Sequence, residues 1–152
     1  MSTFSSIQLD KKSLQKNIGF IRSTIGETSE FVSVIKGNAY GHGIEAFVPL
    51  LFKCGVKSFA VFNSEEARRV VSTGVSYDRL MIMGAIHDAD LAWAIENNID
   101  CYVFAKSRLM QGLEIAKKLR KQFRVHIEVE TGMNRTGFEL SELNEVIRII
   151  KD

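Results

Sequence analysis

Proline and cysteine are scarce in this sequence, which has one proline, Pro49, and two cysteines, Cys54 and Cys101. Two cysteines without a C-x-x-C spacing exclude a disulfide framework and are typical of buried or free thiols in a reducing compartment. Long hydrophobic runs are also lacking, since the longest, residues 46–52, is far too short to span a membrane. The start of the chain has no apolar stretch of signal-peptide length, so we expect a cytoplasmic protein.

Charge of one sign is not concentrated anywhere in the chain. Twenty basic and 18 acidic residues leave a net charge of +2 without a basic block, so nothing points to nucleic acid or a membrane surface as a partner. The hydrophobic content of 45% and the charged content of 25% are those of a globular protein. A chain of 152 residues can bury one core of ordinary size.

Short apolar runs alternate with segments of helical periodicity. The runs predict strands at residues 31–35, 58–62, 80–83, 101–104 and 124–130. Helices are predicted at residues 11–25, 44–53, 64–73, 88–97, 108–121 and from 141 to the terminus.

Polar side chains stand at the predicted helix starts, where each can accept a backbone N–H bond. These predicted caps and first residues are Asp10, Asn63 or Ser64, Asp88, Ser107 and Ser141. Pro49 falls inside the predicted helix at 44–53, so a kink or a late helix start is expected there.

Five strand–helix units in succession predict an α/β fold with parallel strands and helical crossovers. Two architectures fit this pattern, an open doubly wound sheet and a (β/α)8 barrel, and the pattern alone does not choose between them. In both, the chemistry belongs at the carboxyl ends of the strands. Lys36 and the segment 131–138 both follow predicted strands, which supports a shared site.

The segment K-G-N-A-Y-G-H-G, residues 36–43, follows the first apolar run directly. A strand would hold Lys36 rigidly, while three glycines let the backbone approach a ligand closely. A partly desolvated lysine amine is a nucleophile toward carbonyls, as a Schiff base to an aldehyde cofactor requires. The alternative, a solvated lysine after an edge strand, does not explain the glycine-rich loop.

Residues 36–43, preceded by Val34 and Ile35, resemble the lysine motif of the alanine racemases, which bind pyridoxal 5'-phosphate. Gly37 stands where that family usually has alanine. A second stretch, V-E-T-G-M-N-R-T-G-F at 129–138, resembles the family's V-D-T-G-M-x-R-x-G segment. The resemblance runs from Ile7 to the end. It selects the barrel and implies that residues 1–152 form the N-terminal part of a (β/α)8 TIM barrel. About five β/α units would be present, and the remaining strands and a C-terminal β domain would be absent.

The resemblance also implies roles for individual residues. Lys36 would hold pyridoxal 5'-phosphate as a Schiff base and exchange a proton with the substrate. Tyr40 would contact the cofactor phosphate. Arg135 would bind the phenolic oxygen of the cofactor and the substrate carboxylate, with Met133 in the same loop. His42 is expected to shape the glycine loop rather than catalyse, and Asn38 to bond the loop backbone.

His126, Glu128 and Glu130 alternate along the fifth predicted strand and so share one face. As a His-x-Glu-x-Glu set they could bind a metal, but no second ligand cluster is visible, so none is predicted. Many alanine racemases have a carbamylated lysine at the position of Glu128. We therefore hypothesise that Glu128 replaces the carbamate and orients Arg135, directly or through a water. Glu130 is expected to orient the loop.

The function implied is racemisation of L- and D-alanine for peptidoglycan synthesis, by a homodimer whose second base, a tyrosine, comes from the C-terminal domain of the partner subunit. The 152 residues alone are expected to be inactive. Other functions stay open: a non-catalytic pyridoxal-phosphate-binding barrel, a decarboxylase of the same fold, and a structural or interaction fragment without activity. Another small or basic amino acid is an alternative substrate.

Overall fold

The computed structural model describes residues 5–151. The chain divides into two compact units, Met1–Leu80 and Met81–Asp152. The helix predicted from residue 141 is traced to Lys151, and Asp152, the end of that prediction, lies outside the described residues. None of the helices within residues 5–151 is long and apolar enough to cross a membrane.

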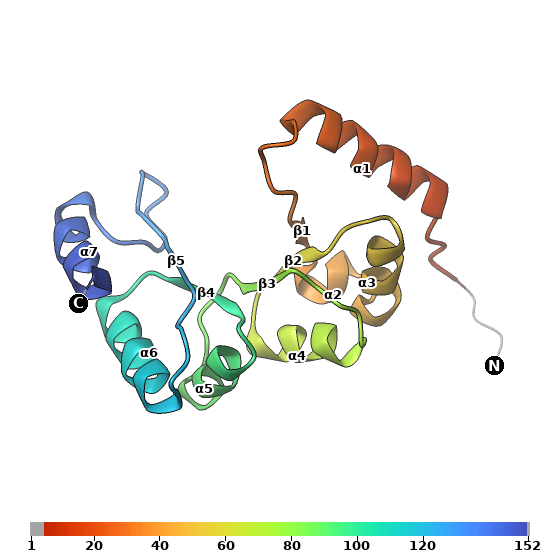
Figure 1. The fold of residues 1–152 in the computed structure, drawn as a ribbon. Coiled ribbons are helices and arrows are strands. Elements are labelled where there is room, and N and C mark those ends of the chain that lie inside the picture. Colours follow the sequence, from red (N-terminus) through yellow and green to blue (C-terminus); the bar gives the residue numbers. More distant parts are fainter. Residues whose placement is uncertain (1–4, 152) are drawn as a thin grey trace. The chain divides into compact units, whose positions relative to one another are not determined.

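The first unit begins with a helix and then alternates strands with helices (Figure 1). Its elements are α1 Lys11–Ile25, β1 Ser33–Val34, α2 Lys36–Tyr40, α3 Ile44–Lys53, β2 Ser58–Val61 and α4 Ser64–Ser72. β1 and β2 run parallel, with Ser33 opposite Phe59. The N–H of Asp78, just before the next strand, donates to Lys57 O over 2.9 Å, so that strand starts beside the start of β2.

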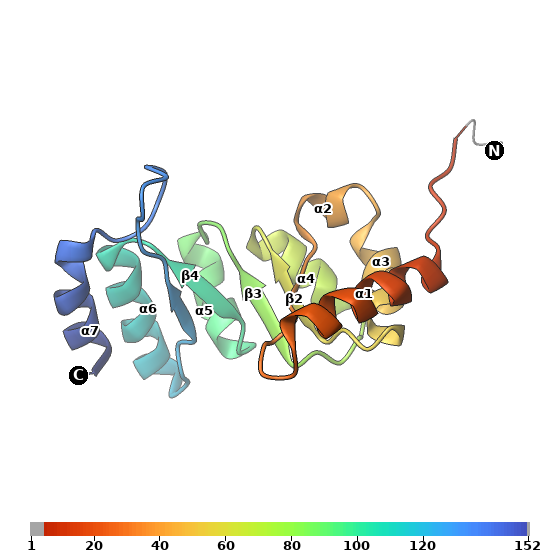
Figure 2. The same ribbon diagram turned by 90° about the horizontal axis from the view of Figure 1, so that it is seen from above.

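The second unit continues the same alternation (Figure 2). β3 Arg79–Ile82 leads into it, and α5 Asp88–Glu96, β4 Asp100–Val103, α6 Lys106–Leu119, β5 Val125–Ile127, the 3₁₀ turn η1 Leu140–Glu142 and α7 Leu143–Lys151 follow. β3 pairs with β4 and β4 pairs with β5, both in parallel, with Met81 opposite Asp100 and Tyr102 opposite His126. The predicted parallel α/β arrangement is confirmed.

Three strands are shorter than predicted, β2 by one residue and β1 and β5 by more. β1 has two residues instead of 31–35, since only Ser33 and Val34 pair before the chain turns at Gly37. β5 has three residues instead of 124–130. Beyond it the backbone pairs with its own continuation: the N–H of Phe138 donates to Glu128 O over 2.8 Å.

Two of the predicted helix caps are confirmed. The Asp10 carboxylate accepts the N–H of Ser13 over 2.6 Å at the start of α1. The Asn63 side chain accepts the N–H of Glu66 over 2.9 Å at the start of α4. Each bond satisfies one of the N–H groups that a first helical turn leaves without a partner.

The cap positions predicted at Asp88, Ser107 and Ser141 are wrong by one to two residues. Asp88 is the first residue of α5, and its carboxylate pairs with Arg108 over 2.8 Å instead of capping the helix, which lowers the pKa of Asp88. α6 begins at Lys106, with Ala105 rather than Ser107 at its cap. The last helical segment begins at Leu140, before Ser141. There Glu139 and Glu142 cap each other's backbone, so a reciprocal pair of carboxylates does what a serine was expected to do.

Pro49 neither delays nor ends α3. The helix begins at Ile44, as predicted for this segment, and continues through Pro49 to Lys53. Proline has no N–H, so the helix lacks one internal hydrogen bond there. The buried stripe formed by Ile44, Val48 and Leu51 faces the core and offsets this loss.

Each unit has its own buried apolar residues. In the first unit they come from the strands and the helices that pack on them, and include Ile35, Ile44, Val48, Phe59 and Val70. In the second unit a cluster of Val103, Leu109, Phe138 and Val146 is joined by half-buried Phe123 and Ile127. Phe138 is the last residue of the loop 129–138, which follows β5, so this core fixes the far end of that loop.

Cys101 is expected to resist thiol reagents in the folded chain. It is 1% exposed in β4, and burial raises the pKa of its thiol to about 12. Because the thiolate is the reactive form, this rise from 9.0 lowers its population on the order of a thousandfold near neutral pH. Titration with dithionitrobenzoate should show fast reaction only at half-buried Cys54, and at both cysteines after unfolding. Fast reaction in a Cys54→Ser variant would contradict this.

Candidate active site

Lys36 lies directly after the first strand, as the sequence predicts. Ile35 is fully buried, and its N–H donates to Ala60 O of β2 over 2.8 Å, so the backbone that leads into Lys36 is held in the sheet. The Lys36 side chain is half-buried. The backbone at Lys36 is therefore fixed and its long side chain is partly covered by protein. This arrangement suits an amine that must reach the same ligand atom each time.

The four residues after Lys36, which make up the rest of the short segment α2, form a left-handed turn that the sequence did not predict. Gly37, Asn38, Ala39 and Tyr40 have φ values of 61°, 56°, 54° and 52°. Glycine adopts this conformation freely and asparagine tolerates it. For residues such as alanine and tyrosine it costs roughly 1–2 kcal/mol each. Contacts elsewhere must therefore hold the turn, and strained backbone beside a candidate catalytic residue is a common feature of functional sites.

Asn38 and His42 stabilise the loop that follows the turn. The Asn38 side-chain oxygen accepts the N–H of Ile44 over 3.1 Å, so this asparagine bonds the loop backbone as expected. Nδ1 of His42 donates to Ala39 O over 2.7 Å, and its ring stacks on Phe47 with 5.3 Å between centroids. A carbonyl only accepts, so Nδ1 carries the hydrogen. These contacts fit the structural role proposed for His42.

Tyr40 is 64% exposed at the end of the turn. Its hydroxyl is therefore open to a ligand, although the role predicted for it, binding a cofactor phosphate, stays a prediction. The backbone before it is anchored because Ala39 is buried and its N–H donates to Ile35 O over 2.8 Å. Lys36 and Tyr40 thus lie at the two ends of one short, fixed segment.

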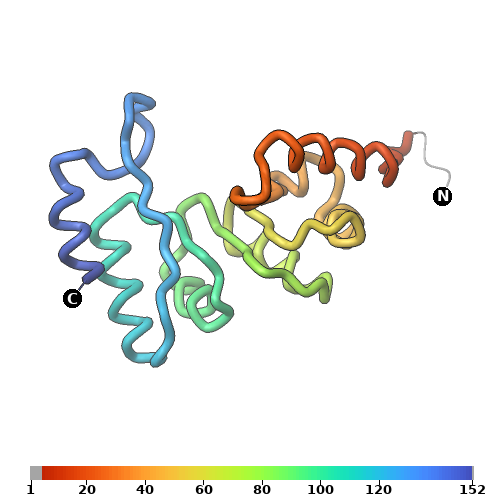
Figure 3. Tube along the Cα trace, turned by 45° about the horizontal axis from the view of Figure 1, so that its top comes forward, coloured from red at the N-terminus to blue at the C-terminus, as the bar shows by residue number. Residues whose placement is uncertain are grey.

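Arg135 and Met133 lie in a projecting loop of the second unit, residues 129–138, between β5 and α7 (Figure 3). The loop is closed at its base by a bridge between Val129 and Phe138. The N–H of Glu130 donates to Phe138 O over 2.9 Å there. Both candidate ligand-binding side chains are exposed, Met133 by 74%. The bridge therefore presents them on a short loop with a fixed base.

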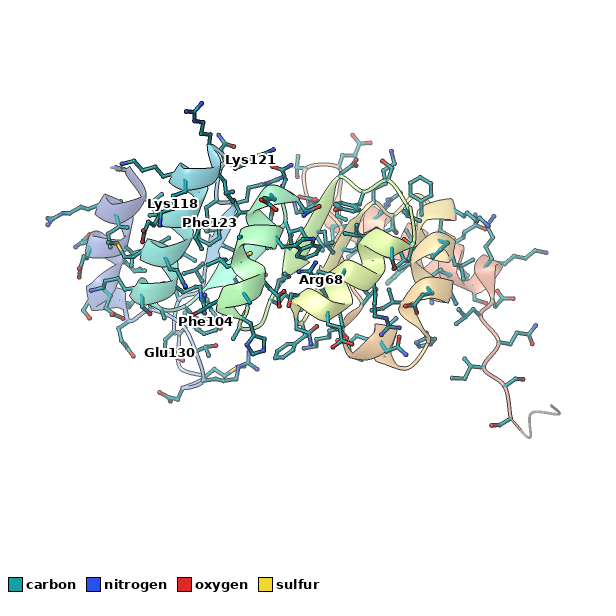
Figure 4. The ribbon with its side chains drawn as sticks, turned by 90° about the horizontal axis from the view of Figure 1, so that it is seen from below. Arg68, Phe104, Lys118, Lys121, Phe123 and Glu130 are labelled. Atoms are coloured by element: carbon teal, nitrogen blue, oxygen red, sulfur yellow. The ribbon has the colours of Figure 1, made fainter. Side chains whose placement is uncertain are left out.

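Glu130 bonds the backbone of this loop (Figure 4). Its carboxylate accepts the N–H of Arg135 over 3.2 Å and also that of Gly132. Hydrogen bonds from backbone N–H groups, that of Asn134 first and then that of Gly132, lower the pKa of Glu130. These contacts agree with the loop-orienting role proposed for this residue, because an ionised carboxylate gathers several N–H groups around itself.

Glu128 bonds the residue next to Arg135. Its carboxylate accepts the Thr136 hydroxyl hydrogen over 2.7 Å. Among the ion pairs of residues 5–151 there is none between Glu128 and Arg135. The hypothesis that Glu128 orients Arg135 stays a prediction, and Thr136 is a neighbour that the sequence did not point to.

His126 is paired away from the two glutamates with which it alternates. Its Nε2 donates to Asp100 over 3.0 Å, and Asp100, buried at 2% exposure, also forms an ion pair with Nε of Arg124 over 2.9 Å. The His126 ring packs beside Tyr102. Within the described part of the chain, no group of three His, Cys, Asp or Glu side chains is arranged to hold a metal ion.

Parallel strands alternating with helices, with a lysine loop after the first strand, define an α/β protein with its candidate site after the strands. A family model described as alanine racemase, N-terminal domain, matches residues 9–152. The chain therefore belongs to the alanine racemase family. This membership confirms the resemblance and the predicted fold class, the N-terminal part of a TIM barrel.

Individual relatives match over most of this chain. An alanine racemase of Methanococcus maripaludis is 31% identical over 144 residues, and one of Francisella philomiragia is 37% identical over 145 residues. Each alignment covers 95% of this chain and 38% of the relative. A solved alanine racemase of Clostridium difficile 630 superposes with a TM-score of 0.84 at 29% identity, over 92% of this chain and 37% of that one. The chain thus spans less than half the length of these relatives.

Proposed function

We propose that this chain is the lysine-bearing part of a racemase that uses pyridoxal 5'-phosphate to interconvert L- and D-alanine, with a Schiff base between Lys36 and the cofactor. The observation that carries the proposal is the position of Lys36. It stands after the short strand β1 and the fully buried Ile35, before a fixed left-handed turn, in a chain of the alanine racemase family.

The side chains present suit this cofactor chemically. Lys36 offers an amine for the cofactor aldehyde, and exposed Tyr40 offers a hydroxyl that can donate to a phosphate. Exposed Arg135 offers a guanidinium fork, which suits a phenolic oxygen or a carboxylate. When bound, pyridoxal phosphate withdraws electrons from the α-carbon of an amino acid and so acidifies the proton there.

The residues of this chain would then position the substrate and move one proton. Arg135 holds the substrate carboxylate, Met133 lies beside it, and Glu130 fixes the loop that carries both. The Lys36 amine takes the α-proton on one face of the substrate or returns it there. The base for the opposite face is proposed to come from a partner subunit, so the working form would be a homodimer. The product D-alanine would serve peptidoglycan synthesis in the cytoplasm.

Replacing Lys36 with alanine should abolish cofactor attachment. Purified chain mixed with pyridoxal phosphate is expected to absorb in the visible range, to lose that band on borohydride reduction, and to yield one dominant reduced peptide that contains Lys36. Lys53→Ala is the matched control, because Lys53 is an exposed lysine at the end of α3. An adduct that is unchanged in Lys36→Ala would remove the proposal. Solvent deuterium uptake at the α-carbon of alanine, in a chain of the relatives' full length, tests the reaction itself.

A further inference from the structure

Asn38, inside the left-handed turn, is held by two side chains of α4. Its N–H donates to Oε1 of Glu66 over 2.9 Å. Its Oδ1 accepts from Nη2 of Arg69 over 2.6 Å. Glu66 and Arg69 are three residues apart and so lie on the same face of the helix. α4 therefore grips one residue of the turn at both its backbone and its side chain.

Glu66 is a buried carboxylate with both oxygens in use. It is 9% exposed, and its Oε2 accepts the N–H of Phe62, the residue after β2, over 2.9 Å. A buried carboxylate is tolerated only when hydrogen bonds replace its water. The two N–H groups that it satisfies belong to different segments, so the carboxylate joins the end of β2 to the turn after β1. A neutral amide in its place can accept at one oxygen only.

Arg69 links the turn to the next helix. Its guanidinium donates to both oxygens of Glu45 in the first turn of α3, each over 2.7 Å, while it also donates to Asn38. This paired contact lowers the pKa of Glu45 to about 2. Bidentate bonds fix orientation as well as distance. The segment from the turn to the start of α3 is thus tied to α4 at two places.

We infer that Glu66 and Arg69 are positioning residues, which hold Asn38 in the left-handed conformation and thereby set where Lys36 and Tyr40 point. The turn is strained at Ala39 and Tyr40 and persists only because such bonds over-determine it. Since the left-handed turn begins directly after Lys36, its loss changes the direction in which the Lys36 side chain leaves the backbone. The inference rests on the proposed role of the Lys36 amine.

The test uses the full chain, pyridoxal phosphate alone as the probe, and borohydride trapping followed by peptide mapping. Glu66→Gln should lower the rate of adduct formation at Lys36 at least tenfold and leave labelling at Lys53 unchanged. Glu65→Gln is the matched control, because it removes the same charge from an exposed neighbour in the same helical turn. Arg69→Lys, which keeps the charge but loses the fork, should lower the rate less than Glu66→Gln does.

Amide hydrogen exchange separates this inference from the proposed function. Without any cofactor, the amides of Asn38 and Gly41 should exchange at least tenfold faster in Glu66→Gln than in the wild-type chain. Their exchange rates should be unchanged in Glu65→Gln. If the wild-type chain forms no adduct at Lys36, the proposed function fails and exchange alone decides whether α4 holds the turn. The inference would be overturned if Glu66→Gln labelled Lys36 at the wild-type rate and also kept the wild-type protection of the Asn38 and Gly41 amides. If Glu66→Gln does not fold, the same two measurements on Arg69→Lys decide.

Discussion

Replacing Gly137 with alanine is expected to lower the free energy of unfolding by about 2–5 kcal/mol and to displace the loop that carries Arg135. Gly137 has a φ of +122°, and a Cβ there would lie 2.5 Å from the nitrogen of Glu130 and 2.8 Å from the carbonyl carbon of Val129. These are backbone atoms at the closed base of the loop, so no side-chain rotation relieves the overlap. The bridge between Val129 and Phe138 must open instead.

Gly132→Ala is the control for this prediction. Gly132 lies in the same loop with a φ of +117°, but a Cβ there would meet no heavy atom within 4 Å. It therefore has the strained backbone without the overlap, and its expected loss is about 1–3 kcal/mol. Urea unfolding of both variants measures the difference, and exchange of the Glu130 amide reports the bridge. Equal losses in the two variants would show that close approach at Gly137 does not matter.

The order and type of the elements could be predicted from the sequence because they depend on local pattern. Apolar runs such as 58–62 and helical stripes such as Ile44, Val48 and Leu51 carry their own signal along the chain. The helix caps were harder. Asp10 and Asn63 cap as expected, whereas Asp88 is drawn to Arg108, twenty positions further along the sequence. A cap is decided by which partner a carboxylate finds in three dimensions.

In the candidate site, too, features with a local sequence pattern could be predicted, and features that depend on distant contacts could not. Lys36 and the loop 129–138 were identified from short motifs, and the structure places each after a strand. The left-handed turn was missed, because glycine and asparagine favour it but Ala39 and Tyr40 do not. The residues that hold it, Glu66 and Arg69, lie about thirty positions away. In the sequence Glu66 is only an acidic residue in a first helical turn, and its buried contact with Asn38 has no local signature.

Gly112→Ala is expected to destabilise the second unit by about 2 kcal/mol, although alanine is the better helix former. Gly112 is buried in α6, and the ring of Phe123, labelled in Figure 4, packs against it. A Cβ at position 112 would lie 2.1 Å from Cε1 of the Phe123 ring and within 2.6 Å of two further ring atoms. To escape, the ring must leave the cluster around Leu109 and Phe138, and so lose its buried contacts.

Gly19→Ala, by contrast, should raise the free energy of unfolding. Gly19 lies inside α1 and is exposed, and a Cβ there meets nothing within 4 Å. Only the helix preference of alanine remains, a gain of about 0.5–1 kcal/mol.

A double-mutant cycle that combines Gly112→Ala with Phe123→Leu completes the test, because removing the ring should also remove most of the penalty at position 112. If Gly112→Ala costs the same with and without the ring, the close packing of Phe123 on α6 is not its cause.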